Sequence, residues 1–426
     1  MIKLPKEVNR ILKALEGAGE EAFAAGECVR DSLVGESPFG WDVLTSAGLD
    51  KLKELFPDGK VISEKYGILR MEYIEEIYDK DGEFEGEEGL IIDVAAYRSG
   101  TTIESQLERK DFTIDAIADS LGRIADPFGG REDIRKKLVR TLRDPDPLFQ
   151  KKPVKMMQAI RYAAQFGFDL HKSVYDAICA NYRKLEESDV NQLREEFTLT
   201  ISAPHAGKGL SMIMDTGILN TILGDDVVRR LTRREKSDLT VLCQNIDKTQ
   251  QVEDRRLGLF YACMDKKRAL PSIEKLGFEG DTCQHLKDAV TDMAKLYFTA
   301  QKAELKKFIY QRGWDRYNYL ASLEKAQRIV FDYYSDTKIK SRMYLLDEIR
   351  TYREPIFEEE LAIDGNDLME AGICKSPEDA AKMLSMLVEE MHVHPRKNTR
   401  KDLLELAKKY KRFKFLTWTR GTHWLH

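Results

Sequence analysis

The stretch that decides the fold lies between residues 26 and 42 and reads GECVRDSLVGESPFGWD. The short apolar run 22–25 precedes it and ends at Gly26, after which Val-Arg-Asp opens a helix. A turn that contains Pro38 then leads to a strand that starts with the carboxylate of Asp42. The stretch therefore predicts a strand, a glycine turn, a helix and a second strand headed by an acid.

The spacing of apolar residues changes near residue 147, which predicts a region of mixed strands and helices followed by a helical one. The mixed part holds short apolar segments separated by Gly, Pro and Asp, and its acidic segment 79–89 is expected to be an exposed hairpin loop. Later segments have helical spacing, from 148–166 to about residue 350. The fold class is therefore α+β, with a small mixed sheet ahead of an all-helical part. The expected strands are 21–25, 41–45, 60–63, 67–74 and 90–97, and the first expected helix is 6–15.

Composition restricts the class of protein. A chain of 426 residues is long enough for about two to four domains. Its formal net charge of -5 means that any surface for a polyanion is a local patch. The six cysteines are scattered without a CxxC pair, which favours buried thiols in a reduced compartment. Because no apolar run approaches the ~20 residues of a membrane helix and the N-terminus lacks a signal-peptide pattern, we expect a cytoplasmic protein without membrane contact.

Three further segments follow in a fixed order. Arg98 ends the apolar strand that contains Asp93, residues 109–116 read RKDFTIDA, and residues 126–130 read DPFGG. Together with 26–42, they resemble the head domain of class II CCA-adding tRNA nucleotidyltransferases and the related bacterial poly(A) polymerases. The resemblance implies a polymerase-β-like nucleotidyltransferase head followed by helical domains. It divides the chain into a head over 1–145, a neck over 146–205, a body over 206–352 and a tRNA-binding tail over 353–426.

The resemblance also implies a site. Phosphoryl transfer is mostly positioning and charge neutralisation, commonly by two Mg²⁺ ions that carboxylates hold. Asp42 and Asp93 match two of the family's acids and are the expected catalytic residues and metal ligands. The positions expected to contact the nucleotide are Gly26, Arg30, Arg98, Arg109, Asp111, Lys152, Lys155 and Arg161.

Two departures affect this site. Family members place a second aspartate two residues before the one that matches Asp42, where both acids share a strand face, but this chain has Gly40. The opening glycine pair of the family reads Gly26-Glu27 here, and a glutamate brings bulk and negative charge to a phosphate turn. Glu36 is a candidate to reach the metal in place of the missing acid.

The neck carries the largest departure. The family reads EDxxR at the start of a helix, whereas this chain reads Lys151-Lys152-Pro153-Val154-Lys155. The resemblance implies that the Asp and Arg of this motif select CTP and ATP by hydrogen-bonding the edge of the base. Cytosine and adenine present amino donors that need an acceptor, and lysine has none. Three lysines at a helix start are also unfavourable beside the helix dipole unless a phosphate lies nearby. We therefore expect Lys151, Lys152 and Lys155 to contact an RNA backbone, with a solvated charge run as the alternative.

The C-terminal region extends the resemblance to about residue 408. The segments 363–368 and 398–404 resemble the family's tail signature, and residues 410–426 mix basic with aromatic side chains that stack bases or pack on the protein itself. The expected function is CCA or A addition to the 3' end of tRNA or a tRNA-like RNA from CTP and ATP, with Mg²⁺ as cofactor. The alternative is a catalytically inactive member that binds tRNA or another structured RNA without adding nucleotides.

Overall fold

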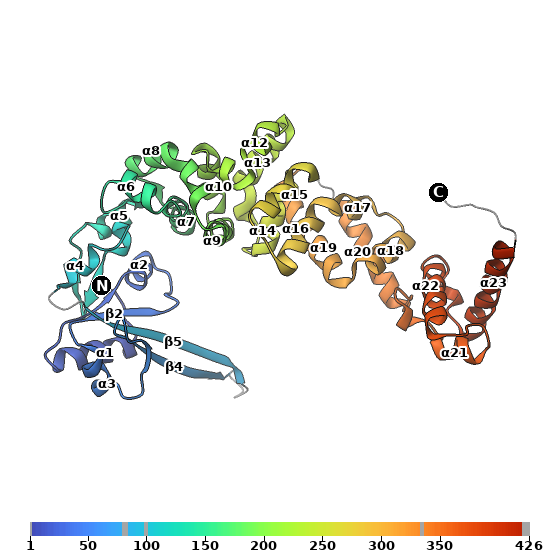
Figure 1. The fold of residues 1–426 in the computed structure, drawn as a ribbon, viewed down its shortest axis with the longest axis horizontal. Coiled ribbons are helices and arrows are strands. Elements are labelled where there is room, and N and C mark those ends of the chain that lie inside the picture. The colour runs from blue at the N-terminus through green and yellow to red at the C-terminus, as the bar shows by residue number, and fades with distance from the viewer. Residues whose placement is uncertain (1, 79–83, 98–100, 333–335, 420–426) are drawn as a thin grey trace. The chain divides into compact units, whose positions relative to one another are not determined.

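The structure is a computed structural model that describes residues 2–78, 84–97, 101–332 and 336–419. The side chains of 75–78, 84–88 and 413–419 lie outside the description. The chain divides into two compact units, 1–225 and 226–426. Figure 1 labels many of their elements.

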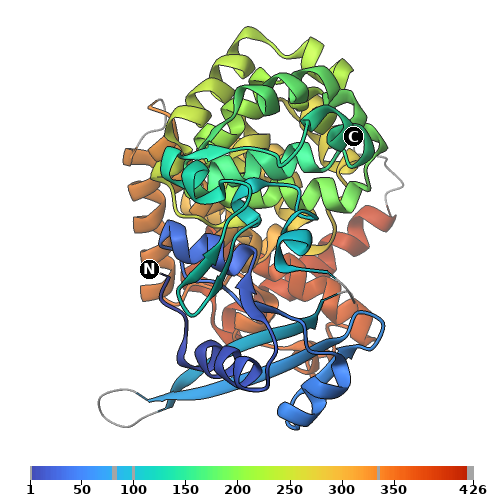
Figure 2. The same cartoon turned by 90° about the vertical axis from the view of Figure 1, so that its left-hand side faces the viewer.

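The first unit begins with a seven-stranded mixed sheet in the order β3-β4-β5-β2-β1-β6-β7. Strands β2 and β5 run parallel, and every other neighbouring pair in this sheet is antiparallel. The long strands β4 and β5 run side by side in Figure 2. The strands are β1 (Ala22–Ala25), β2 (Trp41–Thr45), β3 (Lys60–Ser63), β4 (Ile68–Tyr78), β5 (Phe84–Ala96), β6 (Ala118–Ser120) and β7 (Arg123–Ala125).

One face of this sheet carries the core of the head. Helix α1 (Lys6–Gly17) presents Val8, Ile11, Leu12 and Leu15, which repeat at helical spacing and are buried. They belong to the same core cluster as four side chains of the two central strands, Trp41, Val43, Ile92 and Val94. Because side chains alternate along a strand, the acids between these apolar residues lie on the opposite face. The core thereby fixes the direction in which the predicted acids point.

Helices complete the first unit. A two-stranded parallel sheet of β8 (Leu138–Val139) and β9 (Asp169–Leu170) joins the head to the helices that follow. The helices after α1 are α2 (Glu27–Val34), α3 (Leu49–Leu55), α4 (Ile103–Leu107), η1 (Thr113–Asp115), α5 (Gly130–Lys136), α6 (Pro145–Lys151), α7 (Lys155–Phe166), α8 (Lys172–Asn181), η2 (Tyr182–Glu187), α9 (Val190–Ser202), α10 (Ala206–Asp215), α11 (Ile218–Leu223) and, at the boundary, α12 (Asp225–Arg230).

The second unit is helical throughout its described residues. Helices α14, α16 and α19 pack against one another, and α18 packs on α22. The helices are α13 (Arg233–Asn245), η3 (Ile246–Lys248), α14 (Glu253–Ala262), α15 (Lys266–Lys275), α16 (Gly280–Thr291), α17 (Met293–Phe298), α18 (Lys302–Arg312), α19 (Trp314–Val330), α20 (Asp336–Thr351), η4 (Glu358–Glu360), α21 (Gly365–Glu370), α22 (Pro377–Val393), η5 (Pro395–Lys397) and α23 (Arg400–Thr419). Among the described helices of both units, none combines the length and the apolar character that crossing a membrane requires.

The structure confirms the α+β class and corrects three local predictions. The single helix expected over 148–166 is two helices, α6 and α7, because the chain turns at Lys152–Val154. The acidic segment 79–89 is not all loop, since β5 already begins at Phe84. Strands β6 and β7, of three residues each, were not predicted. The expected boundaries of head, neck, body and tail stay predictions.

Candidate functional site

The glycine turn lies between β1 and α2. Gly26 has φ 88°, a conformation that side chains other than glycine rarely adopt. A Cβ atom here would also lie 3.0 Å from the Nζ atom of Lys110. Glu27 follows as the first residue of α2, with a side chain that is 58% exposed. An acid at this position is favourable to the helix dipole, so Glu27 supports α2 even though it adds negative charge to the turn.

Asp42 and Asp93 are brought together as neighbours on parallel strands. They are partners in the β2–β5 register and lie on the face opposite the core. Partial desolvation by neighbouring protein groups raises the pKa of the Asp42 carboxyl. The ammonium of Lys110 opposes this rise in pKa, and the carboxylates of Asp93 and Glu27 add to it. The turn, the two acids and Lys110 therefore form one electrostatic group.

Arg70 of β4 forms a bidentate ion pair with the carboxylate of Asp93. Its Nε atom donates to Oδ1 at 2.7 Å and its Nη2 atom to Oδ2 at 2.8 Å. The two residues are also register partners across the β4–β5 pair, so the backbone holds them opposite each other. Such a bidentate, charge-assisted pair is among the stronger polar contacts in proteins. Both oxygens of Asp93 are thus engaged by a cation.

These residues do not fit a magnesium centre as they are arranged. Mg²⁺ requires an octahedral set of oxygen ligands, usually with one or two carboxylates free to bind it. Asp93 is held by Arg70, and Gly40 supplies no side chain. In the described part of the chain, no group of three or more His, Cys, Asp or Glu residues is arranged to hold a metal ion. Of the two acids matched to the family, Asp42 is the solvent-exposed one, and the candidate substitute Glu36 is exposed as well.

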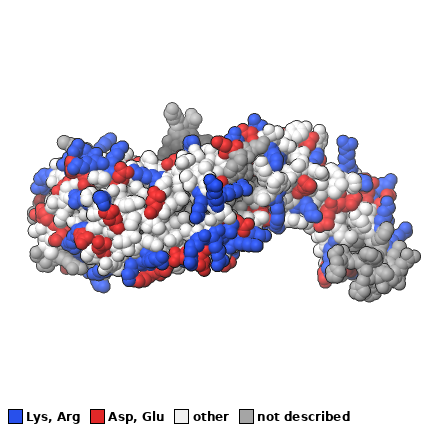
Figure 3. Space-filling view, turned by 90° about the horizontal axis from the view of Figure 1, so that it is seen from above, with Lys and Arg blue, Asp and Glu red and all other residues white. Residues whose placement is uncertain are grey.

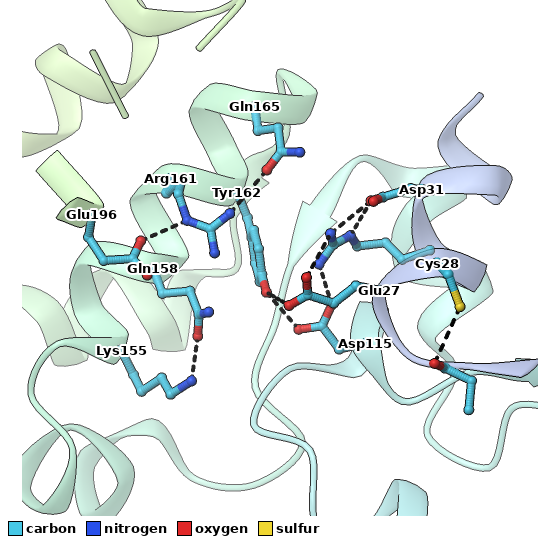
Figure 4. A network of polar contacts seen from close by, with 12 residues as sticks. Glu27, Cys28, Asp31, Asp115, Lys155, Gln158, Arg161, Tyr162, Gln165 and Glu196 are labelled. Carbon is cyan, nitrogen blue, oxygen red and sulfur yellow. Dashed lines mark hydrogen bonds and ion pairs between the residues drawn. The ribbon is translucent and has the colours of Figure 1, made fainter. Parts of the chain in front are cut away.

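Arg30 is the centre of a buried ionic network, drawn in Figure 4. Its side chain is 2% exposed, and its Nη1 atom lies 2.5 Å from Oδ1 of Asp115. It also contacts Asp31 at 2.8 Å, while Glu27 lies 3.9 Å away. Burial by itself would lower the pKa of Arg30, but Asp115 is the strongest of several anionic neighbours that raise it above its usual value. The structure therefore places Arg30 inside the protein with its charge already balanced.

Tyr162 of α7 joins this network to the helices. Its hydroxyl donates to Asp115 at 3.0 Å and reaches Glu27 at 3.3 Å. The guanidinium groups of Arg30 and Arg161 lie 4.7 Å and 4.6 Å from the centre of its ring, a cation–π arrangement. Arg161 in turn donates to Glu196 of α9 at 2.7 Å. Arg161 is thus embedded between α7 and α9, with its side chain 15% exposed.

The thiol of Cys28 contacts the backbone of β1 and β2. It donates to the carbonyl oxygens of Ala25, at 3.5 Å, and of Asp42, at 3.9 Å, which connects α2 to β2. Burial raises the pKa of Cys28 to about 12. A thiol that stays protonated is a poor nucleophile, so Cys28 is a packing residue.

The neck lysines face an acid of the head. Lys152 and Lys155 lie 3.3 Å and 3.2 Å from the carboxylate oxygens of Asp111. Lys155 also donates to Gln158 at 2.7 Å. Together with Lys151, they line one side of an open groove of about 560 Å³, and Ser188, Gln192, Glu195 and Glu196 line the other.

The three lysines do not all stand at a helix start, as the sequence pattern led us to expect. Lys151 is the last residue of α6, where the helix dipole favours a cation, and Lys155 is the first residue of α7. Pro153 lies in the turn between them and not in the first helical turn. The unfavourable dipole argument therefore applies to Lys155, whose charge Asp111 balances.

Two other predicted contacts remain, Arg109 and Arg98. Arg109 is exposed and donates to Gln106 at 3.3 Å. Arg98 lies outside the described residues. On the face that Figure 3 draws, basic and acidic side chains are interspersed. This agrees with the small net charge of the sequence and leaves the lysine groove as a local feature.

Sequence reasoning missed the partners of the predicted residues. It named neither Arg70 as the partner of Asp93 nor Asp115 as the partner of Arg30. Lys110 was read only as part of the segment 109–116 and given no role, although its ammonium lies at the glycine turn. A period-two pattern in β4 that places Arg70 and Leu69 on opposite faces was the available signal for Arg70.

Comparison with known proteins gives a consistent family. The profile of the poly A polymerase head domain matches residues 22–140, and that of the probable RNA and SrmB-binding site of polymerase A matches 167–225. The CCA-adding enzyme of Geobacillus thermodenitrificans is 33% identical over 220 residues, which are 50% of this chain and 54% of that enzyme. The alignment thus spans about half the length of that relative. The CCA-adding enzyme of Streptococcus mutans is 25% identical over 95% of this chain and 98% of its own length.

Solved structures show the same fold. The CCA-adding enzyme of Bacillus stearothermophilus in complex with CTP superposes with a TM-score of 0.75, covering 97% of this chain and 98% of that one at 20% identity. The CCA-adding enzyme of Thermotoga maritima complexed with tRNA has a TM-score of 0.63 at 20% identity, with 95% and 96% coverage. At this identity the likeness is one of fold.

Proposed function

Because the chain belongs to the class II CCA-adding tRNA nucleotidyltransferase and poly(A) polymerase family, we propose that it binds tRNA or a tRNA-like RNA without adding nucleotides. The observation that carries this proposal is the state of the acids in the head. Arg70 holds both oxygens of Asp93, and Gly40 replaces the neighbouring acid. The proposed function therefore keeps the family's RNA-binding architecture and removes its chemistry.

Electrostatics at the acids supports the loss of chemistry. A divalent cation at Asp93 would have to displace a guanidinium held by two short hydrogen bonds, and it would gain no second acid from position 40. Asp42 is left without a neighbouring acid at position 40. A single free carboxylate is a poor ligand set for Mg²⁺.

The positions of base recognition support it independently. Lysine has three donors and no acceptor, so Lys152 and Lys155 offer nothing to the amino groups of cytosine or adenine. Both ammonium groups lie against Asp111, a predicted nucleotide contact, and occupy its carboxylate. The chain therefore lacks a free acceptor at the positions that match the family's base readers.

RNA binding is supported by exposed groups in the first unit. Lys151 and Lys152 are exposed at the groove between α6, α7 and α9, where they can neutralise backbone phosphates. Phe39, beside the acid-bearing strand β2, has a side chain that is 94% exposed. An exposed aromatic ring is a platform on which an unpaired base can stack. The relative from Thermotoga maritima was solved with tRNA bound.

Changing Lys151, Lys152 and Lys155 together to alanine is expected to weaken RNA binding and to flatten its salt dependence. Each phosphate that a lysine no longer neutralises should reduce the slope of log K against log salt by about 0.7–0.9. Fluorescence anisotropy with a labelled tRNA, repeated over a series of salt concentrations, measures both quantities. An unchanged slope would exclude these lysines from the RNA interface.

A matched pair of controls sharpens this experiment. Asp111→Asn removes the acid that competes with phosphate for Lys152 and Lys155, so it should strengthen binding and steepen the slope. Replacing the exposed lysines Lys266, Lys267 and Lys275 of α15 removes the same charge elsewhere. If this second triple variant loses as much affinity as the first, the effect is one of total charge and the groove is not the binding site.

A second candidate function is nucleotide addition to an RNA 3' end from CTP and ATP. It is favoured by the register of β2 and β5, which still places Asp42 beside Asp93, and by the exposure of Asp42. It requires that Arg70 leave Asp93 when RNA and nucleotide bind. In that case Glu36 or Glu27 would have to supply the acid that Gly40 lacks. Addition of A without C would point to a poly(A)-type activity.

A further inference from the structure

We propose that a cavity in the second unit binds a nucleobase that carries an amino or ring N–H donor, either in a free nucleotide or in an unpaired residue of a bound RNA. The cavity has a volume of about 460 Å³, within the range of small-molecule pockets. Its wall comes from α13, α14, α16, α17 and α19 together with Met264. It lies entirely in residues 226–426, so this inference does not depend on the head.

The cavity wall holds one polar group whose hydrogen-bonding capacity is unused. Gln327 of α19 lines the cavity and is 2% exposed, and its side-chain oxygen Oε1 has no hydrogen-bond partner among the described residues. A buried acceptor left unpaired is destabilising, because it has lost its hydrogen bonds to water without gaining others. Native structures seldom retain such a group without a reason, and a ligand is one of the few. A ligand that donates an N–H to Gln327 would satisfy it.

The rest of the wall suits a flat, apolar ring. Ala289, Met293 and Ala294 are small or flexible apolar side chains, and Tyr297 and Phe298 are aromatic. The two aromatic rings meet edge to face, with their centres 5.3 Å apart. Phe298 is 70% exposed, an unusual state for such a side chain beside a cavity. Aromatic side chains are platforms on which bases of any sequence stack.

Positive charge lies over the ring faces of this platform. The ammonium of Lys338 in α20 lies 4.0 Å from the centre of the Tyr297 ring and 4.6 Å from that of Phe298. Arg234 of α13 also lines the cavity, with a side chain that is 79% exposed and 3.6 Å from Asp238. An aromatic wall, a buried acceptor and cations at the edge together match a base with an attached phosphate. An uncharged apolar ligand would use only the first of these.

The ligand class can be tested by calorimetric titration of the full chain with AMP and with purine riboside monophosphate, which lacks the amino donor. Binding of AMP at least about tenfold tighter, or about 1.4 kcal/mol, is expected. A short single-stranded oligoadenylate serves as the second probe. Binding of AMP itself identifies a free nucleotide as the source, and binding of the oligonucleotide alone identifies an RNA residue.

Variants tie either result to the cavity. Gln327→Leu should weaken binding of the preferred probe about tenfold and abolish the preference for the amino group. Gln327→Glu, which keeps an acceptor at this position, should retain that preference. Phe298→Ala should also weaken binding, whereas Tyr344→Ala, at an aromatic residue that is 65% exposed in α20 and does not line the cavity, should not.

Two outcomes would overturn this inference. The first is that neither probe binds. The second is that a probe binds but with an affinity that is unchanged in both Gln327→Leu and Phe298→Ala. The second outcome would locate the nucleotide elsewhere, for example in the head. Neither outcome bears on tRNA binding by the lysine groove, because the variants of Lys151, Lys152 and Lys155 test that groove separately.

Discussion

Replacing Arg30 by methionine should destabilise the first unit by about 3–5 kcal/mol, the typical effect of removing one partner of a buried ion pair. The substitution removes the guanidinium that balances Asp115, which is itself 6% exposed. Burial raises the pKa of Asp115, and Arg30 is the main group that opposes this rise. Without Arg30 the buried carboxylate would keep the neutral Tyr162 hydroxyl as a donor but lose the cation that is paired with it.

The loss of stability in the Arg30→Met variant should depend on pH. A carboxyl whose pKa is raised in the folded state binds a proton there more readily than in the unfolded chain. Stability therefore falls as pH rises from the unfolded pKa through the folded one. In this variant the pKa of Asp115 rises further, so the loss should be smaller at pH about 5 than at pH about 8.

Hydrogen exchange of the amides in α2, β2 and α7, followed by mass spectrometry, reads the stability of this unit separately from that of the other. The double variant Arg30→Met/Asp115→Asn should be more stable than Arg30→Met alone, because the most deeply buried carboxylate of the network is then neutral. Arg135→Met is the control: Arg135 is 72% exposed and pairs with Glu132 on the surface. Equal effects of Arg30→Met and Arg135→Met would contradict the assignment of Arg30 to the interior.

The double variant Gly40→Asp/Arg70→Leu is expected to bind divalent cations at least about tenfold more tightly than the unchanged protein, since it adds one carboxylate and frees another. An aspartate at position 40 would share the face of Asp42, two residues further along. There is room for it, because a Cβ at Gly40 would come no closer than 3.4 Å to another atom, the carbonyl oxygen of Ile91. Leucine at position 70 cannot hold Asp93.

Titration with Mn²⁺, followed by electron paramagnetic resonance, measures this gain. Gly40→Asn/Arg70→Leu is the matched control, with the shape of the aspartate but not its charge. The affinity of the control for Mn²⁺ should stay close to that of the unchanged protein. Should the unchanged protein already bind Mn²⁺ as tightly as Gly40→Asp/Arg70→Leu, Arg70 and Gly40 are not what prevents metal binding, and the argument from these residues is wrong.

The order of strands and helices in the head could be predicted from the sequence because its signals are local. Apolar runs bounded by Gly, Pro and Asp marked β1, β2 and β3 within one residue of their observed bounds. The glycine turn at Gly26 was equally readable, since the positive φ there needs glycine. Strands β6 and β7 escaped because three residues carry too little periodicity to be recognised.

The partners within the site depend on register, which local patterns do not fix. A hairpin centred in the middle of the expected loop 79–89 would place Glu75 opposite Asp93. In the observed register the partner of Asp93 is Arg70 instead, five residues earlier in β4. A shift of this size changes the neighbour of a predicted catalytic acid from an anion to a cation. The roles assigned to Asp42 and Asp93 therefore stay predictions, while their position as neighbours is an observed fact.

Long-range pairs were out of reach for the same reason. Sequence reasoning identified the neck lysines as chemically incompatible with base reading, which needs only the identity of the residues. It could not find that Asp111, some forty positions earlier, balances Lys152 and Lys155. Nor could it separate α6 from α7, because the apolar spacing continues across the turn at Pro153. The identity of a side chain can be read from the sequence, but its interaction partner can be found only once the fold is known.

The most direct test of the central claim is incubation of the protein with a tRNA that ends before its CCA, in the presence of Mg²⁺ and labelled CTP and ATP. A CCA-adding relative is assayed in parallel. We expect the tRNA to bind but labelled product to form at least about a thousandfold more slowly than with the relative, since several kcal/mol of charge stabilisation is lost. Faithful addition of C, C and A at a comparable rate would contradict the account.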